Sequence, residues 1–263
     1  MTSLGRVIAG DLRELEYQAV RMRVRCTPKG DTGRRKFFVI GHPRTGTTSL
    51  HHIFLANNRK SSHTSGRWRS ARYDAFADRG NFQPFQQLDR RYPNSWFILN
   101  NRPAFNYIRS IFRHWNSRSR RKGNRMRGRV SERAVEGEIL RRNQHFLDVV
   151  RYFEQRGNLL VADIEEPGAT EFLCSRLGLE DPGGVWRNEA SSKPSFSLVT
   201  TVSRAFENLG ITDEKFNPFI IPSLLKPSDR KWAKRFLSER RDWIFVSKRW
   251  TTDRPDSDLG GAS

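Results

Sequence analysis

The segment Lys36 to Leu50 (KFFVIGHPRTGTTSL) constrains the fold of this chain more than any other feature. A short continuous apolar run, Phe37 to Gly41, leads into a turn rich in Gly and Pro, which is typical of a buried strand. From Thr47 to Asn57 the apolar residues recur at helical spacing. Backbone N–H groups in such a strand-to-helix loop point at one spot, where the helix dipole adds partial positive charge. The segment therefore predicts a binding site for a phosphate-like anion.

The same order of strand and helix recurs along the chain. Trp96 to Leu99 predicts a second strand, and a helix with Phe105, Ile108, Phe112 and Trp115 on one face is expected from about Ala104. Ser131 is the predicted N-cap of a long helix, and Leu159 to Ile164 (LLVADI) predicts a further strand. This alternation predicts an α/β fold of the P-loop type, with a central parallel sheet between helices in a three-layer α/β/α arrangement.

The length of 263 residues suits one substantial α/β domain, which we expect over residues 36–250. A helix through Trp232 and Phe236 and a strand at Trp243 to Val246 are expected to complete it. Residues 1–35 have the pattern of an amphipathic basic helix followed by breakers, and the polar tail over residues 251–263 is expected to be disordered.

The sequence contains no obvious membrane or secretion segment. No apolar run approaches the roughly 20 residues that a spanning helix needs. The first residues carry charges throughout and lack the apolar core of a signal peptide. Cys26 and Cys174 have neither metal nor redox spacing, so we expect inert thiols and no disulfide. These features favour a soluble, cytoplasmic protein.

Positive charge dominates the composition. The chain has 48 Lys and Arg against 28 Asp and Glu, for a formal net charge of +20 and a pI near 11.0. Such a surface attracts anions, which include phosphorylated cofactors, acidic glycans, nucleic acid and membrane faces. Charge alone does not choose among these partners.

The predicted loop differs at one position from the P-loop of enzymes that hydrolyse nucleotides. Gly41 and Gly46 occupy its two glycine positions with four residues between them, but Thr47 stands where the phosphate-binding lysine is required. Arg44 instead supplies positive charge from inside the loop. A P-loop small-molecule kinase would need that lysine and a carboxylate for Mg²⁺, so this alternative is disfavoured.

Two segments resemble the cofactor site of sulfotransferases that use 3′-phosphoadenosine 5′-phosphosulfate (PAPS). The sequence PRTGTTSL is similar to their 5′-phosphosulfate loop, whose usual form is Pro, Lys or Arg, a small residue, and Gly-Thr-Thr. In the second segment, Phe97 to Trp115, Arg102 follows a predicted strand and Ser110 comes eight residues later. It resembles the family's 3′-phosphate site, where such an Arg and Ser hold the phosphate by a charge-assisted fork and a hydroxyl. The resemblance covers roughly residues 37–178.

The resemblance implies in-line transfer of a sulfuryl group from PAPS to an acceptor hydroxyl or amine, with 3′-phosphoadenosine 5′-phosphate (PAP) as product and no metal. Because a guanidinium does not readily release a proton, Arg44 would act as a charge and hydrogen-bond clamp on the leaving phosphate. The acceptor is open: positive charge favours an acidic or carbohydrate acceptor over an arene or a lipid. The residues implied at the loop are Arg44, Thr45, Gly46, Thr47, Thr48 and Ser49.

The acceptor must lose a proton, so a general base is expected between the first helix and the Trp96 strand. His63 is one candidate, because imidazole titrates near neutral pH. Asp74 and Asp78 resemble an acidic segment at this place in related bacterial sulfotransferases, and Asp89 is a fourth candidate. The sequence does not choose among them. The histidines nearest the loop are interpreted as structural: His42, His51 and His52.

Two polar segments complete the candidate site. Trp186 to Ser195 (WRNEASSKPS) lies where family members place a loop that closes over the cofactor, so Arg187, Asn188 and Lys193 are candidate ligands beside the alternative of a plain surface loop. The run from Arg113 to Arg129 carries eight Arg or Lys residues and is interpreted as a mobile basic loop, either solvated or forming a groove for a polyanion.

A non-enzymatic protein that binds nucleic acid or another polyanion is the second alternative. It would explain the charge, and Trp115 within the Arg-rich run could stack on bases. It would not explain two phosphate sites at the family's spacing, and nucleic acid is therefore not the favoured partner.

Overall fold

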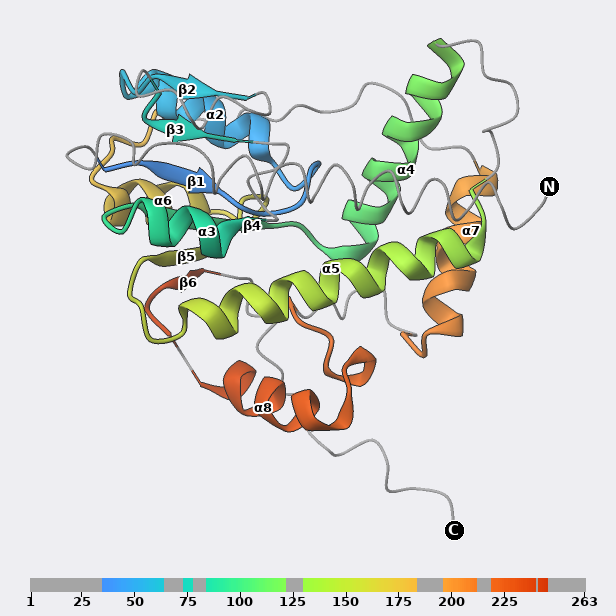
Figure 1. The fold of residues 1–263 in the computed structure, drawn as a ribbon. Helices are drawn as coiled ribbons and strands as arrows, with labels where there is room; N and C mark the ends of the chain where they lie inside the picture. Colours follow the sequence, from blue (N-terminus) through green and yellow to red (C-terminus); the bar gives the residue numbers. More distant parts are fainter. Residues whose placement is uncertain are drawn as a thin grey trace. The chain divides into compact units, whose positions relative to one another are not determined.

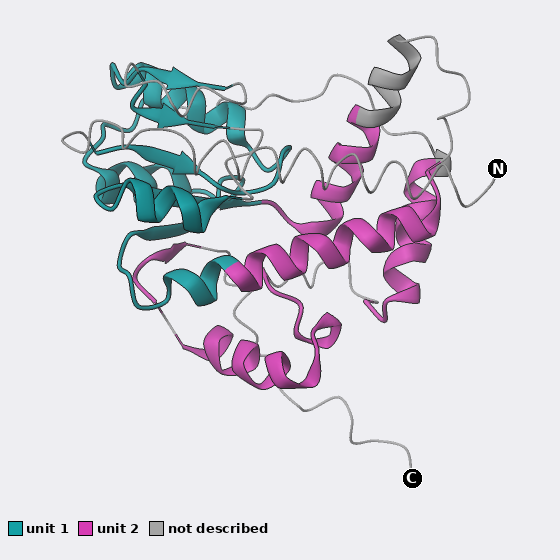
Figure 2. Ribbon diagram, viewed as in Figure 1, with its two compact units in different colours: residues 1–101, 149–191 teal, residues 102–148, 192–263 magenta. Residues whose placement is uncertain are grey.

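The structure is a computed structural model that describes residues 35–63, 73–77, 84–121, 130–183, 196–211, 219–239 and 241–245. The chain forms two compact units, each made of two stretches of sequence (Figure 2). Unit 1 comprises residues 1–101 and 149–191, and unit 2 comprises residues 102–148 and 192–263. The single domain expected over residues 36–250 stays a prediction. The expected N-terminal helix and C-terminal tail lie outside the described residues.

The α/β fold expected from the sequence is confirmed. The strands of unit 1 are all parallel and follow the order β2-β3-β1-β4-β5. The register sets Val39 opposite Ile98, and Asn101 opposite Asp163. The long strands are buried and mainly apolar, as expected for a parallel sheet covered on both faces, with polar residues only at their carboxyl ends. The strands are β1 (Phe37–Val39), β2 (Ser61–Ser62), β3 (Ala75–Phe76), β4 (Trp96–Asn101) and β5 (Leu159–Asp163).

Helices lie on both faces of the strands of unit 1 (Figure 1). On one face, the ring of Phe37 packs 5.2 Å from that of Phe54 on α2 (Thr47–Ala56). On the other face, Phe38 stacks on Phe97 at 5.3 Å, and Phe97 meets Phe153, the last residue of α5 (Glu132–Phe153), at 4.8 Å. Phe153 also contacts Phe85 on α3 (Phe85–Arg91). Successive strand residues point to opposite faces, so these contacts give the three layers.

Unit 2 is built mainly from helices. Phe105 on α4 and Phe206 on α7 meet edge to face at 5.5 Å in an apolar cluster to which α5 adds Val135 and Ile139. The apolar face expected on α4 is confirmed for its three described members, since Phe105, Ile108 and Phe112 are all buried. The elements of this unit besides α5 are α4 (Ala104–Arg121), α7 (Phe196–Asn208), the 3₁₀ turn η2 (Pro222–Leu224), α8 (Pro227–Ser238) and β6 (Ile244–Phe245).

The helix ends follow local chemistry. The expected cap of α5 is present, because the Ala134 N–H donates to Ser131 Oγ at 3.3 Å. The helix α6 (Ala169–Leu177) ends at Gly178, whose φ of 66° suits a C-terminal glycine. None of the helices in the described ranges is both long enough and apolar enough to cross a bilayer.

One expectation about the basic run is wrong. Residues from Arg113 to Arg121 continue α4 as a helix and do not form a loop. The physical reason is that no Gly or Pro occurs between Ala104 and Lys122, and Arg is a good helix former. The breaker Gly123 comes only after the helix. Residues 122–129 lie outside the described residues.

Candidate functional site

The Gly-Thr-Thr loop connects β1 to α2 at the carboxyl edge of the sheet. Ile40 makes the last backbone bond to β4, with its N–H 2.8 Å from the carbonyl oxygen of Ile98. Two residues then adopt left-handed backbone conformations, Arg44 with φ of 75° and Gly46 with φ of 97°. Left-handed residues in a loop directly before a helix aim successive N–H groups into a concavity that suits an anion. A positive φ is uncommon for a non-glycine residue, so the turn at Arg44 is held by its surroundings.

Asn100 on β4 supplies much of that support. Its side chain is fully buried, and its Oδ1 accepts the Gly41 N–H at 3.1 Å. Its Nδ2 donates to the carbonyl oxygen of Thr45 at 2.9 Å and to Thr45 Oγ1 at 2.6 Å. Thr45 Oγ1 in turn donates to the His42 carbonyl at 2.6 Å. Both ends of the loop are therefore fixed to the neighbouring strand. Asn100 was not predicted from the sequence, although a polar residue within the apolar run FILNN was a usable signal.

Close packing explains both loop glycines. A Cβ atom on Gly41 would lie 2.1 Å from the backbone oxygen of Asn100. A Cβ atom on Gly46 would lie 1.6 Å from Cδ1 of Ile164, which directly follows β5. Neither position has room for a side chain, so the loop can keep this shape only with glycine at both places.

His63 lies against the start of α2. It directly follows β2, and its Nε2 is 3.1 Å from Thr48 Oγ1 and 3.4 Å from Thr47 Oγ1. The ring of His51 packs 5.4 Å from that of His63, and His51 Nδ1 lies 2.7 Å from Ser61 Oγ. The structure therefore brings one of the four candidate bases into direct contact with the loop hydroxyls.

The surroundings of the neighbouring His51 determine its protonation state. Burial, together with the smaller effect of the nearby charges of His63 and His52, lowers the pKa of His51 to about 4. Burial disfavours the charged imidazolium, and like charges add to this effect. His51 is therefore neutral at neutral pH.

The structure does not bring Asp74 to the loop. Asp74 directly precedes β3, where its carbonyl accepts the N–H of Phe37 and its Oδ2 accepts the N–H of Lys60. These partners lie at the amino edge of the sheet, whereas the loop and His63 follow the carboxyl ends of their strands. Asp74 lies at the amino edge because it directly precedes β3. The sequence pattern does not reveal this strand, which has only two residues. Asp78 lies outside the described residues.

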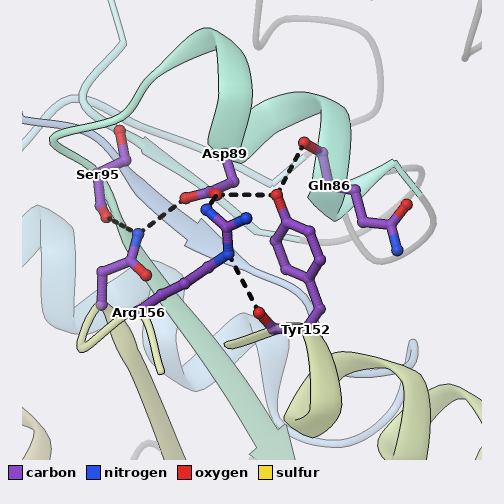
Figure 3. A network of polar contacts seen from close by, with 6 residues as sticks. Gln86, Asp89, Ser95, Tyr152 and Arg156 are labelled. Atoms are coloured by element: carbon purple, nitrogen blue, oxygen red, sulfur yellow. Dashed lines mark hydrogen bonds and ion pairs between the residues drawn. The ribbon is translucent and has the colours of Figure 1, made fainter. Parts of the chain in front are cut away.

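Asp89 is also away from the loop, in a polar network that joins α3 to the end of α5 (Figure 3). Its Oδ2 accepts from Arg156 Nη1 at 2.9 Å and from the Tyr152 hydroxyl at 3.0 Å, and its Oδ1 accepts from Asn158 Nδ2 at 2.9 Å. Asn158 precedes β5 and also donates to the carbonyl of Ser95, which precedes β4. Both oxygens of Asp89 are engaged at the amino edge of the sheet, so its role is structural.

Replacing Asp89 by Ala should lower the free energy of unfolding by about 2–4 kcal/mol, because three donors lose a largely buried carboxylate. Arg156 is 46% exposed and its charge is partly screened, which keeps the loss near the lower end of this range. Asp148→Ala is a matched control, because Asp148 is exposed and accepts a hydrogen bond from Gln144 on the same helix. Asp148→Ala should lower the free energy of unfolding by no more than about 0.5 kcal/mol. Equal losses in urea unfolding would contradict this role for Asp89.

The second predicted phosphate site lies at the start of unit 2. Arg102 comes directly after Asn101, the last residue of β4, and Ser110 is buried in the second turn of α4. Burial lowers the pKa of Arg113, and the charges of Arg102 and Arg109 lower it further. Arg102 and Arg109 are therefore close enough to Arg113 for their charges to act on it, and these like charges raise the positive potential around Arg113.

The residues present fit the phosphate and sulfate groups of the implied cofactor. The loop offers backbone N–H groups, the hydroxyls of Thr47 and Thr48 and the guanidinium of Arg44, and these donors suit oxyanions. Among the described residues, no group of three or more His, Cys, Asp or Glu side chains is placed to hold a metal ion. The remaining candidate ligands lie outside the described residues: Arg187, Asn188 and Lys193.

No family model matches the chain, and no curated protein sequence matches it. Support for a function therefore comes from the loop, from the residues in contact with it and from the charge of the molecule.

Proposed function

We propose that this chain is a PAPS-dependent sulfotransferase that acts on a hydroxyl or amine acceptor. The observation that carries the proposal is the braced Gly-Thr-Thr loop with Arg44 inside it and the imidazole of His63 against its hydroxyls. An anion cradle and a titratable group in contact with it are what displacement at an anionic donor needs. Thr47 in place of lysine argues against phosphoryl transfer by a P-loop kinase.

The loop would bind the phosphosulfate group of the cofactor. Bound PAPS supplies an activated sulfuryl group whose leaving group is the 5′-phosphate of the nucleotide. Arg44 and the N–H groups of Gly46, Thr47 and Thr48 stabilise the negative charge that grows on the bridging oxygen. Thr45 and Ser49 belong to the same segment. The Thr45 hydroxyl donates to the His42 carbonyl, so the role of Thr45 is to shape the loop.

His63 is the general base in this proposal. Its Nε2 is the ring atom that faces the loop hydroxyls, so Nε2 accepts the proton of an acceptor seated beside Thr47 and Thr48. A neutral imidazole can take up a proton near neutral pH. Asp74 stays at the other edge of the sheet and would have no part in the step.

Arg102 and Ser110 hold the 3′-phosphate of the cofactor in this proposal. Arg113 lies close enough to Arg102 for their charges to interact, and its guanidinium strengthens the local attraction for a phosphate. Arg187 and Lys193 stay predicted cofactor ligands.

The acceptor is proposed to be a carbohydrate or another small molecule, and the net charge of +20 favours one that is acidic. A cytoplasmic location is part of the proposal. Cys174 is a free, buried thiol whose pKa is raised to about 11, mainly by burial and also by the charge of Asp181. A thiol of this kind is inert and needs no oxidising compartment.

The proposal is tested by incubating the protein with PAPS labelled in its sulfur and a panel of hydroxyl and amine acceptors. We expect transfer of label to at least one acceptor, with one PAP formed per sulfuryl group transferred. Transfer of phosphate from ATP to the same acceptors, without transfer from PAPS, would support the kinase alternative instead. Tight binding of oligonucleotides with no turnover of either donor would support the polyanion-binding alternative.

His63→Ala should lower turnover by about 10²- to 10⁴-fold, because the acceptor loses its general base. The affinity for PAP should change little, since the loop that binds the nucleotide phosphate is unaltered. Asp74→Asn is the matched comparison, and its turnover should stay within about twofold of the unsubstituted protein because Asp74 lies at the opposite edge of the sheet. Loss of turnover in Asp74→Asn with normal turnover in His63→Ala would reverse the assignment.

A further inference from the structure

Asn100 is a polar side chain at the centre of the sheet, on a strand that lies between β1 and β5. It has no exposed surface, and it makes three hydrogen bonds, all of them to the Gly-Thr-Thr loop. Burial of an amide is costly unless its polar atoms find partners, and here the loop provides those partners. The buried positions before it on β4, Phe97 to Leu99, are all apolar, so burial in the strand does not by itself explain an asparagine here.

The three bonds fix two separated points of the loop. Gly41 lies at its start and Thr45 lies one residue before Gly46, so one side chain sets the span of the turn that contains Arg44. The amide also occupies the space beside Gly41, because a Cβ atom there would lie 2.3 Å from Asn100 Oδ1. Gly41 and Asn100 therefore form a matched pair, in which the missing side chain of one makes room for the amide of the other.

We propose that Asn100 is a positioning residue for the anion site. It holds Thr45 and Gly41 so that the left-handed turns at Arg44 and Gly46 persist and the N–H groups that open α2 converge on one point. The identity of the anion as a nucleotide phosphate rests on the proposed function, but the positioning of the loop does not. Removing the amide leaves the Gly41 N–H and the Thr45 carbonyl without these partners, and the loop then relaxes away from its anion-binding shape.

The test compares Asn100→Ala with Asn143→Ala. Asn143 is equally buried and makes the same kind of bonds in unit 2, where its Oδ1 accepts the Ile221 N–H at 2.6 Å and its Nδ2 donates to the Ile221 carbonyl at 3.0 Å. Both substitutions should lower thermal stability to a similar extent. Only Asn100→Ala should weaken PAP binding by calorimetry, by about tenfold or more. Asn100→Ala that binds PAP within twofold of the unsubstituted protein would overturn the proposal.

Two further measurements keep the outcome decisive. If Asn100→Ala does not fold, Asn100→Asp keeps the size of the side chain and the acceptor for Gly41 while it removes both donors to Thr45, and it should show the same loss of affinity. If the unsubstituted protein does not bind PAP, the proposed function fails. The positioning role of Asn100 is then tested by NMR, from the backbone amide resonances of Gly46, Thr47 and Thr48. These resonances should shift in the Asn100 variant and not in Asn143→Ala. Unchanged resonances in both variants would refute it.

Discussion

On the proposed function, Arg44→Ala should lower sulfuryl turnover by about 10²- to 10³-fold, the loss expected when one donor to a developing negative charge is removed. Arg44 is the basic residue inside the loop, and its guanidinium is assigned to the leaving phosphate. Thermal stability should change little, because alanine and arginine pay a similar cost for the positive φ of 75° at this position. Steady-state turnover of labelled PAPS and thermal unfolding measure the two effects.

Two controls define the Arg44 result. Arg44→Lys keeps a positive charge, so it should retain most of the activity that Arg44→Ala loses. A lysine cannot form the bidentate hydrogen bond that an arginine makes to a phosphate. Arg59→Ala removes an exposed arginine of the same unit just beyond α2, and its turnover should match that of the unsubstituted protein. Full turnover by Arg44→Ala would remove Arg44 from the mechanism.

Gly46→Ala should lower the free energy of unfolding by about 3 kcal/mol, the second large effect. A left-handed alanine costs about 1–2 kcal/mol, and forcing an extra carbon into a packed site adds about 1–3 kcal/mol. The added Cβ would meet Cδ1 of Ile164 at 1.6 Å, so α2 and the end of β5 must move apart. Urea unfolding measures the loss.

The matched control for Gly46 is Gly157→Ala. Gly157 has a similar positive φ of 70°, but beyond its chain neighbours no atom lies within 4 Å of the position that an added Cβ would take, so only the backbone cost of about 1–2 kcal/mol is expected. Gly46→Ala should also cost less in an Ile164→Ala background, because the clashing side chain is gone. Equal losses for Gly46→Ala and Gly157→Ala would show that contact with Ile164 is unimportant.

The sequence was sufficient to predict the elements with long apolar patterns. The strand before the loop, the helices from Thr47 and from Ala104 and the strand at Leu159 were found because continuous apolar runs and helical spacing are local signals. The strands β2 and β3 have two residues each, too few for any period, and α3 and α7 were not predicted either. The basic run after Arg113 is helical as far as Arg121 because it lacks helix breakers up to that point, a weaker signal than its high charge, which is typical of a loop.

The sequence predicted the parts of the candidate site that a local motif carries, but not those that depend on how the strands pair. The motif identified the loop residues, and His63 was one of four candidate bases. The structure separates His63 from Asp74 and Asp89 because β3 and α3 place those carboxylates at the amino edge of the sheet. Asn100 was missed because its role depends on the pairing of β4 with β1, which brings together residues 55 and 59 positions apart in the chain.

Binding of PAP compared with adenosine 5′-monophosphate, which lacks the 3′-phosphate, tests the central claim most directly. We expect calorimetry to show affinity for PAP at least about tenfold greater, a preference lost in Arg102→Ala. Equal affinity for the two nucleotides, or tighter binding of ATP than of PAP, would contradict the proposed binding of a 3′-phosphate by Arg102 and Ser110.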